Sequence, residues 1–381
     1  MAGINDYTHN LRRIDEWLRR NKTPRAVIFD VGTRAARVMV GPKKLAAATS
    51  WNEGTFFTAG FVTALGGDVE PVSQVLHVGE SPALVKLADF INDTMAVLRA
   101  NGVPDTNIVA IGTEVFRSLS DANLGEVIAW LKQQTGLTLQ VIDGKTEARL
   151  SLIAAFMTHK LNLPAELWLD ANKGERFLLI DQGGGSTEIS FAISQQKAQL
   201  ESKADLGTVT LRRMFFGGLD GVDAESNHAT IPEQYERVLA YVRQRVESYE
   251  FPKQSFKIAY GLGTAVTACF PGTNNWKIHN QPASIEFLSN VERKRCETLA
   301  ANYSSVAELY NAIEQEKDDN RHVKMDKEVL VLYGLPVFRM ILEKASFSEI
   351  RICGFPLRYG AFIVWHHAGW GWDLRPRPAA G

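Results

Sequence analysis

Cysteine is scarce in this chain. The only three copies, Cys269, Cys296 and Cys353, stand far apart without Cys-x-x-Cys spacing. That distribution excludes a disulfide scaffold and a cysteine-based zinc site, and it indicates reduced core residues in a cytoplasmic protein. The eight histidines also lack metal-ligand spacing, and the pair His366-His367 follows an apolar segment. We expect that pair to be structural rather than a zinc site.

An excess of charge of either sign is also missing, because 42 Lys and Arg residues meet 43 Asp and Glu residues. A formal net charge of −1 gives no case for bulk binding to nucleic acid or to a membrane surface. No apolar run reaches membrane-spanning length, and the N-terminus lacks the apolar core of a secretion signal. The 381 residues, 45% of them hydrophobic, predict a soluble globular protein of two domains.

The most informative segment is a glycine-rich stretch between two apolar runs, Asp181-Gln-Gly-Gly-Gly-Ser-Thr-Glu188. Glycines allow a tight turn whose N–H groups suit phosphate, and neighbouring hydroxyls add further donors. Asp181 and Glu188 flank the turn as oxygen ligands for a hard cation such as Mg²⁺, directly or through water. The candidate phosphate-binding residues are Gly183, Gly184, Gly185, Ser186 and Thr187.

Two other glycine motifs do not fit this stretch. A dinucleotide-binding turn runs into a helix, whereas the residues after Glu188 alternate between apolar and small polar types, as in a strand. A phosphate loop of the Walker type needs a following Gly-Lys-Ser/Thr, which is absent. The glycines therefore stand at the tip of a β-hairpin, and an ordinary hairpin turn without a ligand is the alternative.

A second copy of the pattern occurs near the N-terminus, where an apolar strand ends in Asp30-Val-Gly32-Thr33-Arg34 and another apolar strand follows. A third glycine tip, Gly261-Leu-Gly263-Thr264, precedes small residues that could open a helix. Each tip alone is a weak signal. Together they predict two successive α/β blocks that bind phosphate through Gly32, Thr33 and Arg34 and through the second hairpin.

The remaining chain alternates between helices and strands, which predicts α/β layers with helices covering sheets. A basic amphipathic helix over residues 4–22 docks by its apolar stripe or serves as a polyanion-guiding extension. The further expected elements are helices at 82–101 and 121–134, strands at 108–113, 137–142 and 349–353, a mostly helical region at 285–342, a short apolar segment at 361–365 and an irregular tail.

Several motifs follow one another in a recognisable order: Asp30-x-Gly32, Gly112-Thr113-x-x-x-Arg117, Gly144-x-x-Glu147-Ala-Arg149-Leu150, Asp181-x-Gly-Gly-Gly-Ser-Thr-Glu188, Leu206-Gly207, Gly263-Thr264 and Leu357-Arg358-x-Gly360. This order resembles the exopolyphosphatase / guanosine pentaphosphate phosphohydrolase (Ppx/GppA) family, in the superfamily of actin, sugar kinases and heat-shock chaperone ATPases. The resemblance implies two ribonuclease H-like (actin-like ATPase) α/β domains facing across a cleft. We expect an N-terminal extension at 1–24, domains at 25–150 and 151–365, and a tail at 366–381.

The resemblance also implies roles for single residues. Glu147 would be the catalytic base that activates water, although an acidic residue here could merely cap a helix. Arg117 would contact substrate phosphate, with a surface ion pair as the alternative. Gly263 and Thr264 match the loop that contacts the nucleoside in nucleotide-using relatives. Asp181 and Glu188 would hold Mg²⁺ or Mn²⁺, and Asp30 is a weaker candidate for that duty.

The chain departs from the family in the first loop, where Thr33-Arg34-Ala35 replaces the usual Ser-Asn-Ser. Arg34 could restore phosphate affinity through its charge or block the usual substrate pose, and the sequence leaves both open. The family's glycine-rich segment after this hairpin is not recognisable, and Phe56 to Gly60 stand near its place. The longer members' extra C-terminal helical domains are not expected, which favours short polyphosphates or guanosine pentaphosphate as substrates.

Three hypotheses follow from these motifs: a Mg²⁺-dependent phosphoanhydride hydrolase, a polyphosphate or alarmone sensor with weak turnover, and a kinase, against which the intact Glu147 motif argues. Ser186 and Thr187 lack a His–Asp pair to activate them, so direct attack by water is expected. We expect no nucleic-acid or membrane partner and leave a homodimer open.

Overall fold

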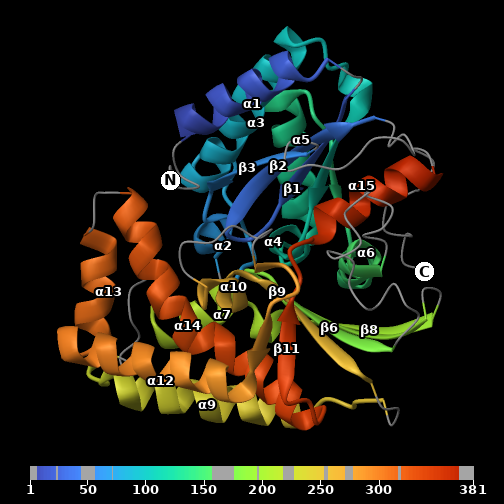
Figure 1. The fold of residues 1–381 in the computed structure, drawn as a ribbon. Coiled ribbons are helices and arrows are strands. Elements are labelled where there is room, and N and C mark those ends of the chain that lie inside the picture. The colour runs from blue at the N-terminus through green and yellow to red at the C-terminus, as the bar shows by residue number, and fades with distance from the viewer. Residues whose placement is uncertain are drawn as a thin grey trace. The chain divides into compact units, whose positions relative to one another are not determined.

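The chain forms two compact units, Met1–Trp168 together with Leu357–Gly381, and Leu169–Pro356 (Figure 1). The computed structural model describes residues 7–22, 25–43, 56–70, 72–156, 176–194, 197–217, 227–252, 256–270, 278–315 and 319–368. We expected the second domain to run through residue 365. The structure instead assigns helix α15 (Leu357–Ala368) to the first unit, because this helix packs on α6 (Gly144–Phe156) and β1 (Arg25–Val31).

The first unit is built on a five-stranded sheet with the order β3-β2-β1-β4-β5. β1 forms an antiparallel hairpin with β2 and pairs in parallel with β4, which in turn pairs in parallel with β5. All seven residues of β1 are buried, as expected for a central strand covered on both faces. The other elements of this unit are α1 (Tyr7–Arg20), β2 (Ala35–Pro42), β3 (Phe57–Val62), α2 (Leu65–Asp68), α3 (Pro82–Ala100), β4 (Ile108–Gly112), α4 (Glu114–Arg117), α5 (Asp121–Thr135) and β5 (Leu139–Val141).

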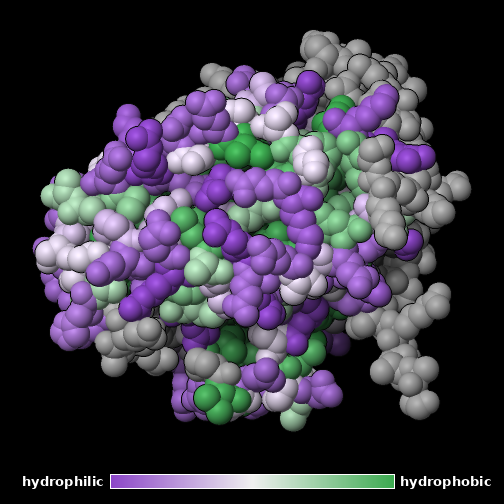
Figure 2. All heavy atoms as spheres, turned by 90° about the horizontal axis from the view of Figure 1, so that it is seen from below, coloured by the Kyte–Doolittle hydropathy of each residue, from purple (hydrophilic) through white to green (hydrophobic). Residues whose placement is uncertain are grey.

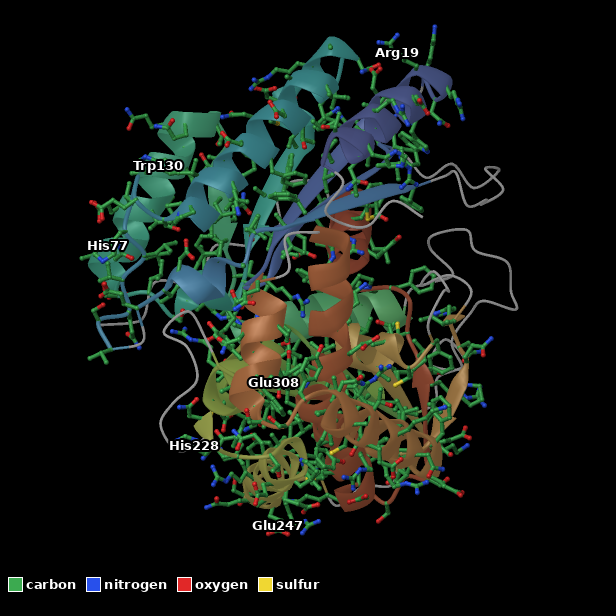
Figure 3. All side chains as sticks on the ribbon, turned by 90° about the vertical axis from the view of Figure 1, so that its left-hand side faces the viewer. Arg19, His77, Trp130, His228, Glu247 and Glu308 are labelled. Carbon is green, nitrogen blue, oxygen red and sulfur yellow. The ribbon has the colours of Figure 1, made fainter. Side chains whose placement is uncertain are left out.

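Helix α1 is the amphipathic helix that the N-terminal pattern predicts. Ile14 and Leu18 are buried where α1 packs against α3 and β3, whereas Arg19 points away from the ribbon (Figure 3). The guanidinium of Arg13 lies 5.3 Å from the ring centroid of Phe57, and this cation–π contact adds to the docking. The apolar stripe therefore anchors the helix to its own unit.

The second unit repeats the arrangement of the first. Its sheet has the order β10-β11-β9-β6-β7-β8, in which β6, β7 and β8 form an antiparallel meander and β6 pairs in parallel with β9. Read from β8, the order of its first five strands matches that of β3-β2-β1-β4-β5 in the first unit. The elements of this unit are β6 (Phe177–Gln182), β7 (Thr187–Ser194), β8 (Lys197–Lys203), α7 (Thr208–Phe215), α9 (Ile231–Glu247), β9 (Ile258–Gly263), α10 (Thr264–Ala268), β10 (Pro282–Ser284), α12 (Ile285–Asn302), α13 (Val306–Gln315), α14 (Asp319–Lys344) and β11 (Glu349–Ile352).

The expected helical region at 285–342 is confirmed as helices α12, α13 and α14, and α14 continues through Pro336. Helices α9, α12 and α14 pack on one another. A buried ion pair lies at their contact, where Arg339 donates to both carboxylate oxygens of Glu292 and Tyr235 donates to the same carboxylate. The expected apolar segment at 361–365 is part of α15, which continues to Ala368 and so includes the first three residues of the expected tail at 366–381. The rest of that tail lies outside the described residues.

Most large apolar side chains of the described residues lie in the two cores. The exposed large ones are Val72, Val85, Met214 and Phe287. Figure 2 accordingly shows hydrophilic residues interspersed with small hydrophobic patches on the face that it presents. None of the helices within the described residues has the length and apolar character needed to span a membrane.

Candidate phosphate and cation site

The second glycine hairpin is held from behind by the start of α7. The backbone N–H of Thr208 donates to the carbonyl of Gly183 at 3.0 Å, and that of Val209 donates to the carbonyl of Gly184 at 2.6 Å. The Thr210 hydroxyl donates to the carbonyl of Gly185. Among the described residues, the N–H groups of Gly184 and Gly185 have no acceptor. With its carbonyls taken by α7, the turn presents donors, as an anion site requires.

Two further glycines allow this close approach. A Cβ atom at Gly207 would overlap the backbone of Gly185 and Ser186, and one at Gly263 would overlap the carbonyl oxygen of Gln182. Gly263 also has a φ of +123°, which L side chains rarely adopt. Because β6 and β9 pair in parallel with Gln182 opposite Gly263, the third glycine tip lies beside the second hairpin. Thr264 then opens helix α10, as its sequence predicts.

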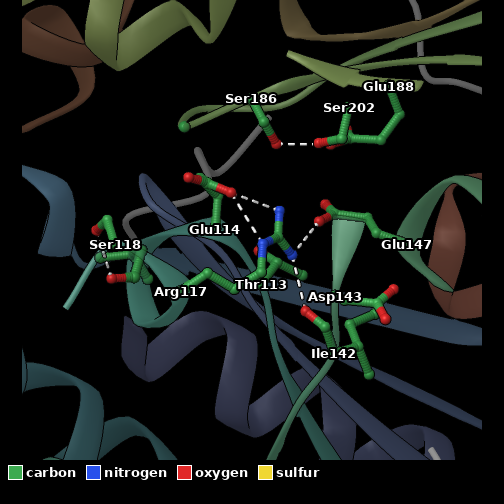
Figure 4. A network of polar contacts seen from close by, with 12 residues as sticks. Thr113, Glu114, Arg117, Ser118, Ile142, Asp143, Glu147, Ser186, Glu188 and Ser202 are labelled. Carbon is green, nitrogen blue, oxygen red and sulfur yellow. Dashed lines mark hydrogen bonds and ion pairs between the residues drawn. The ribbon is translucent and has the colours of Figure 1, made fainter. Parts of the chain in front are cut away.

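The two predicted cation ligands face each other across this hairpin. Asp181 and Glu188 are directly opposite in strand register, so their side chains leave the sheet on the same face. Glu188 is buried, and its Oε1 accepts from Ser186 Oγ at 2.7 Å and from Ser202 Oγ at 2.8 Å (Figure 4). Asp181 is partly exposed. Within the described residues no group of three or more His, Cys, Asp or Glu side chains could hold a metal ion. Mg²⁺ needs only one or two carboxylates when substrate phosphates and water complete its shell, so this pair fits such an ion.

The hydroxyl groups of the second hairpin donate within the protein. Ser186 Oγ donates to Glu188, and Thr187 Oγ1 donates to the carbonyl of Leu206 at 2.8 Å. We predicted both hydroxyls as phosphate donors, and the structure directs their protons to protein acceptors.

The charge of the Asp181 carboxylate acts on the buried Cys353 thiol. Burial raises the pKa of Cys353 to about 12, and the Asp181 carboxylate adds to this rise, so the thiol stays protonated.

The first glycine hairpin joins β1 to β2 through Gly32, Thr33 and Arg34. Gly32 N–H donates to the carbonyl of Ala35 and closes the turn. The carbonyl of Thr33 accepts from Gly66 N–H, and the carbonyl of Arg34 accepts from the N–H groups of Thr63 and Ala64. A glycine-rich segment, Leu65-Gly66-Gly67, thus supports the hairpin. Phe56 to Gly60, which stand near the expected place of the family's glycine-rich segment, lie mostly in β3.

Asp30 lies at the end of β1, just before this turn. It is 5% exposed, and its Oδ2 lies 3.5 Å from Arg358 NH1 of α15. In strand register its partner across the hairpin is Arg37, where the second hairpin has Glu188. The expected cation ligand of the first hairpin therefore has basic side chains as neighbours.

Arg117 and Glu147 meet at the same edge of the first sheet. The ends of β1, β4 and β5 lie side by side, because Val31 pairs with Gly112 and Gly112 with Val141. α4 starts after β4 and α6 starts after β5, so both helices begin at this edge.

The Arg117 guanidinium joins two carboxylates there (Figure 4). Its NH1 donates to Glu147 Oε2 at 2.8 Å and to the carbonyl of Ile142 at 2.9 Å. Its Nε and NH2 lie 2.9 Å and 2.6 Å from Glu114 Oε2. The side chains of Arg117 and Glu147 are 16% and 9% exposed, so the cluster is set into the surface rather than spread over it. Glu147 is thereby oriented by a charged hydrogen-bond donor.

Most of the sequence matches a family model. The model of the Ppx/GppA phosphatase family covers residues 91–368, a span that includes Arg117, Glu147 and the second hairpin. The chain belongs to the Ppx/GppA phosphatase family. The predicted family is thereby confirmed, and so is the general prediction of a phosphatase.

Solved structures of this family share its fold. An Aquifex aeolicus Ppx/GppA phosphatase is 19% identical, with a TM-score of 0.60 over 89% of this chain and 98% of the other. An exopolyphosphatase from Cytophaga hutchinsonii is 15% identical, with a TM-score of 0.59 over 92% of this chain and 100% of the other. The predicted α/β fold with two actin-like domains is confirmed by this likeness and by the two sheets.

Each unit of this Ppx/GppA-family protein gathers part of the predicted site. In the first unit, the turn Gly32–Arg34 lies at the same sheet edge as Thr113, since Thr113 N–H donates to the Val31 carbonyl next to Gly32. In the second unit, the turn Gly183–Ser186 has Gly263 beside it. Sequence reasoning missed the residues that hold these groups from other elements, namely Glu114, Ser202, Thr208, Thr210 and the ion-pairing role of Arg358.

Proposed function

We propose that this phosphatase releases terminal orthophosphate from inorganic polyphosphate, from guanosine pentaphosphate, or from both. The observation that carries the proposal is the Glu147–Arg117 pair, a nearly buried carboxylate held at 2.8 Å by a guanidinium. A general base must be ionised and aimed, and an arginine partner favours both.

Glu147 would accept a proton from a water molecule as the water oxygen bonds to the terminal phosphorus. The P–O bond to the bridging oxygen breaks, and orthophosphate leaves together with a chain that is one phosphate shorter. Such transfer depends on positioning and charge stabilisation rather than on a protein nucleophile. Arg117 would both hold Glu147 and contact a phosphate oxygen, and the N–H groups of Gly184 and Gly185 would bind another phosphate oxygen.

Asp181 and Glu188 would hold the cation, Mg²⁺ or Mn²⁺. When bound, the cation would offset the negative charge of the phosphate oxygens. The two hydroxyls on Glu188 Oε1 fix this carboxylate in place, so the partly exposed Asp181 is the better candidate for direct contact.

The solved relatives, an exopolyphosphatase and Ppx/GppA phosphatases, support the substrate class. Phosphate release from short polyphosphate, long polyphosphate and guanosine pentaphosphate should be measured side by side with Mg²⁺, with Mn²⁺ and with a chelator. We expect release that needs the cation from at least one of the three substrates. Absence of release from all three substrates with either cation would overturn the proposal.

A sensor with weak turnover is the second candidate, and Arg34 in the first turn favours it. The backbone of Arg34 is held in this turn, because its carbonyl accepts from the N–H groups of Thr63 and Ala64. Calorimetric binding of guanosine pentaphosphate without turnover would support the sensor, and ready turnover would exclude it. An Arg34→Ser variant that gains activity would show that Arg34 impairs the wild-type enzyme.

A further inference from the structure

The two hairpins occupy matching places in a repeated sheet but differ at one position. β1 and β2 correspond in strand order to β6 and β7. The residue opposite the aspartate is Arg37 in the first hairpin and Glu188 in the second. Residues opposite in an antiparallel pair share a face of the sheet. The second hairpin therefore sets two carboxylates together, whereas the first sets a carboxylate beside a guanidinium.

A second arginine also reaches Asp30, from the other end of the sequence. Arg358 is 7% exposed, and its NH1 lies 3.5 Å from Asp30 Oδ2. Its Nε is buried and has no acceptor within the described residues. A buried guanidinium needs an acid nearby, and Asp30 supplies it. A divalent cation on the same carboxylate would have to displace Arg358 or tolerate its repulsion.

The same turn of α15 touches the helix that carries Glu147. A Cβ atom at Gly360 would overlap the carbonyl oxygen of Leu150, so α15 and α6 are in backbone contact there. Glu147 lies in the first turn of α6, one turn before Leu150. The segment Leu357–Gly360 thus contacts both the first hairpin and the helix of the proposed base. This segment is the family motif that has no role in the proposed reaction.

We propose that Asp30 is the counter-ion of Arg358 rather than a ligand of the cation, and that Arg358 and Gly360 are positioning residues. The ion pair of Arg358 with Asp30 connects α15 to the first hairpin. Gly360 allows α15 to pack closely on α6, the helix that carries Glu147 in its first turn. The effect on turnover rests on the proposed function, but the ion pair itself does not.

A double-mutant cycle tests the ion pair without substrate. Melting temperatures should be compared for the wild type, Asp30→Asn, Arg358→Gln and the double variant, all without added metal. Asp30→Asn leaves the buried Arg358 guanidinium without its acid, and Arg358→Gln removes the arginine that lies 3.5 Å from Asp30. Each single variant should therefore melt lower, and the double variant should melt above the worse single variant. A double variant that loses the sum of both single effects would overturn the pairing. This result is readable even if no substrate is turned over.

Turnover distinguishes a positioning role from a purely structural one. Asp30→Asn should leave the half-saturating Mg²⁺ concentration unchanged, whereas Asp181→Asn should raise it by about tenfold or more. Arg358→Gln should lower kcat more than it changes KM, and Arg358→Lys should recover part of the loss. If Asp30→Asn raises the Mg²⁺ requirement as Asp181→Asn does, Asp30 is a cation ligand and the proposal fails. Unchanged kcat in folded Arg358→Gln would exclude a positioning role.

Discussion

At the scale of single residues, the lack of a side chain at Gly207 allows α7 to approach the second hairpin closely. A Cβ atom there would overlap the backbone of Gly185 and Ser186. Gly207→Ala should therefore shift α7, cost about 1–3 kcal/mol of unfolding free energy and weaken phosphate binding. Gly125→Ala is the matched control, because a Cβ at Gly125 of α5 would meet nothing within 4 Å. It should stabilise the helix by about 0.5–1 kcal/mol. Chemical unfolding and substrate KM of both variants check this, and equal effects would contradict it.

The three cysteines should be inert while the protein is folded. Burial raises the pKa of Cys269 and of Cys353 to about 12, and it also raises the pKa of Cys296. Because the thiolate is the reactive form, a thiol reagent at pH 8 should label the native protein slowly and the urea-unfolded protein quickly. Mass spectrometry after alkylation measures both rates. Fast loss of activity on labelling the native protein would show that a thiol is accessible.

The residues proposed to contact substrate stand in motifs along the chain, whereas the residues that hold them in place do not. Glu147 and Arg117 stand in motifs that can be recognised along the chain. Glu114 is not one of the residues that define such a motif, and nothing in its local sequence indicates that it forms an ion pair with Arg117. Ser202 reaches Glu188 only because β7 pairs with β8 in a particular register. Such partners depend on tertiary contacts, which local sequence patterns do not encode.

At the scale of elements, the best predictions rested on local chemistry. Helix α3 begins where Ser81 caps it by accepting from Leu84 N–H at 3.0 Å, and it ends at Asn101, as its sequence predicts. Helix α14 lies in the region expected to be mostly helical, and it continues through Pro336 although proline usually ends a helix. Packing on α9, α10 and α12 stabilises α14 across that point.

The packing of α12 on α14 depends on a buried ion pair. Burial raises the pKa of Glu292, while Arg339 and Tyr235 donate hydrogen bonds that favour its carboxylate form. Glu292→Ala leaves the Arg339 guanidinium without this partner and should lower the free energy of unfolding by about 3–5 kcal/mol. Glu343→Ala removes the exposed partner of the same arginine and should cost at most about 1 kcal/mol. Urea unfolding compares the two variants, and equal losses would show that burial does not set the strength of this pair.

At the scale of the whole molecule, the two hairpin motifs predict a duplicated α/β fold, and the matching strand orders of the two sheets confirm it. What the sequence could not show is that the chain returns to its first unit through α15. The apolar residues of α15 would suit the core of either unit. The close contact between Gly360 and Leu150 places this helix against α6, and the sequence does not reveal that contact. The cation, the cytoplasmic location and a homodimer all stay predictions.

The most direct test of Glu147 as the base is whether the variant Glu147→Gln loses turnover but keeps substrate binding. Phosphate release and calorimetric substrate binding should be measured with Mg²⁺ for the wild type, Glu147→Gln and the exposed-surface control Glu297→Gln. We predict that Glu147→Gln binds substrate as the wild type does and turns it over about 10²–10⁴ times more slowly, while Glu297→Gln matches the wild type. A Glu147→Gln variant as active as Glu297→Gln would contradict the role of Glu147 and the mechanism built on it.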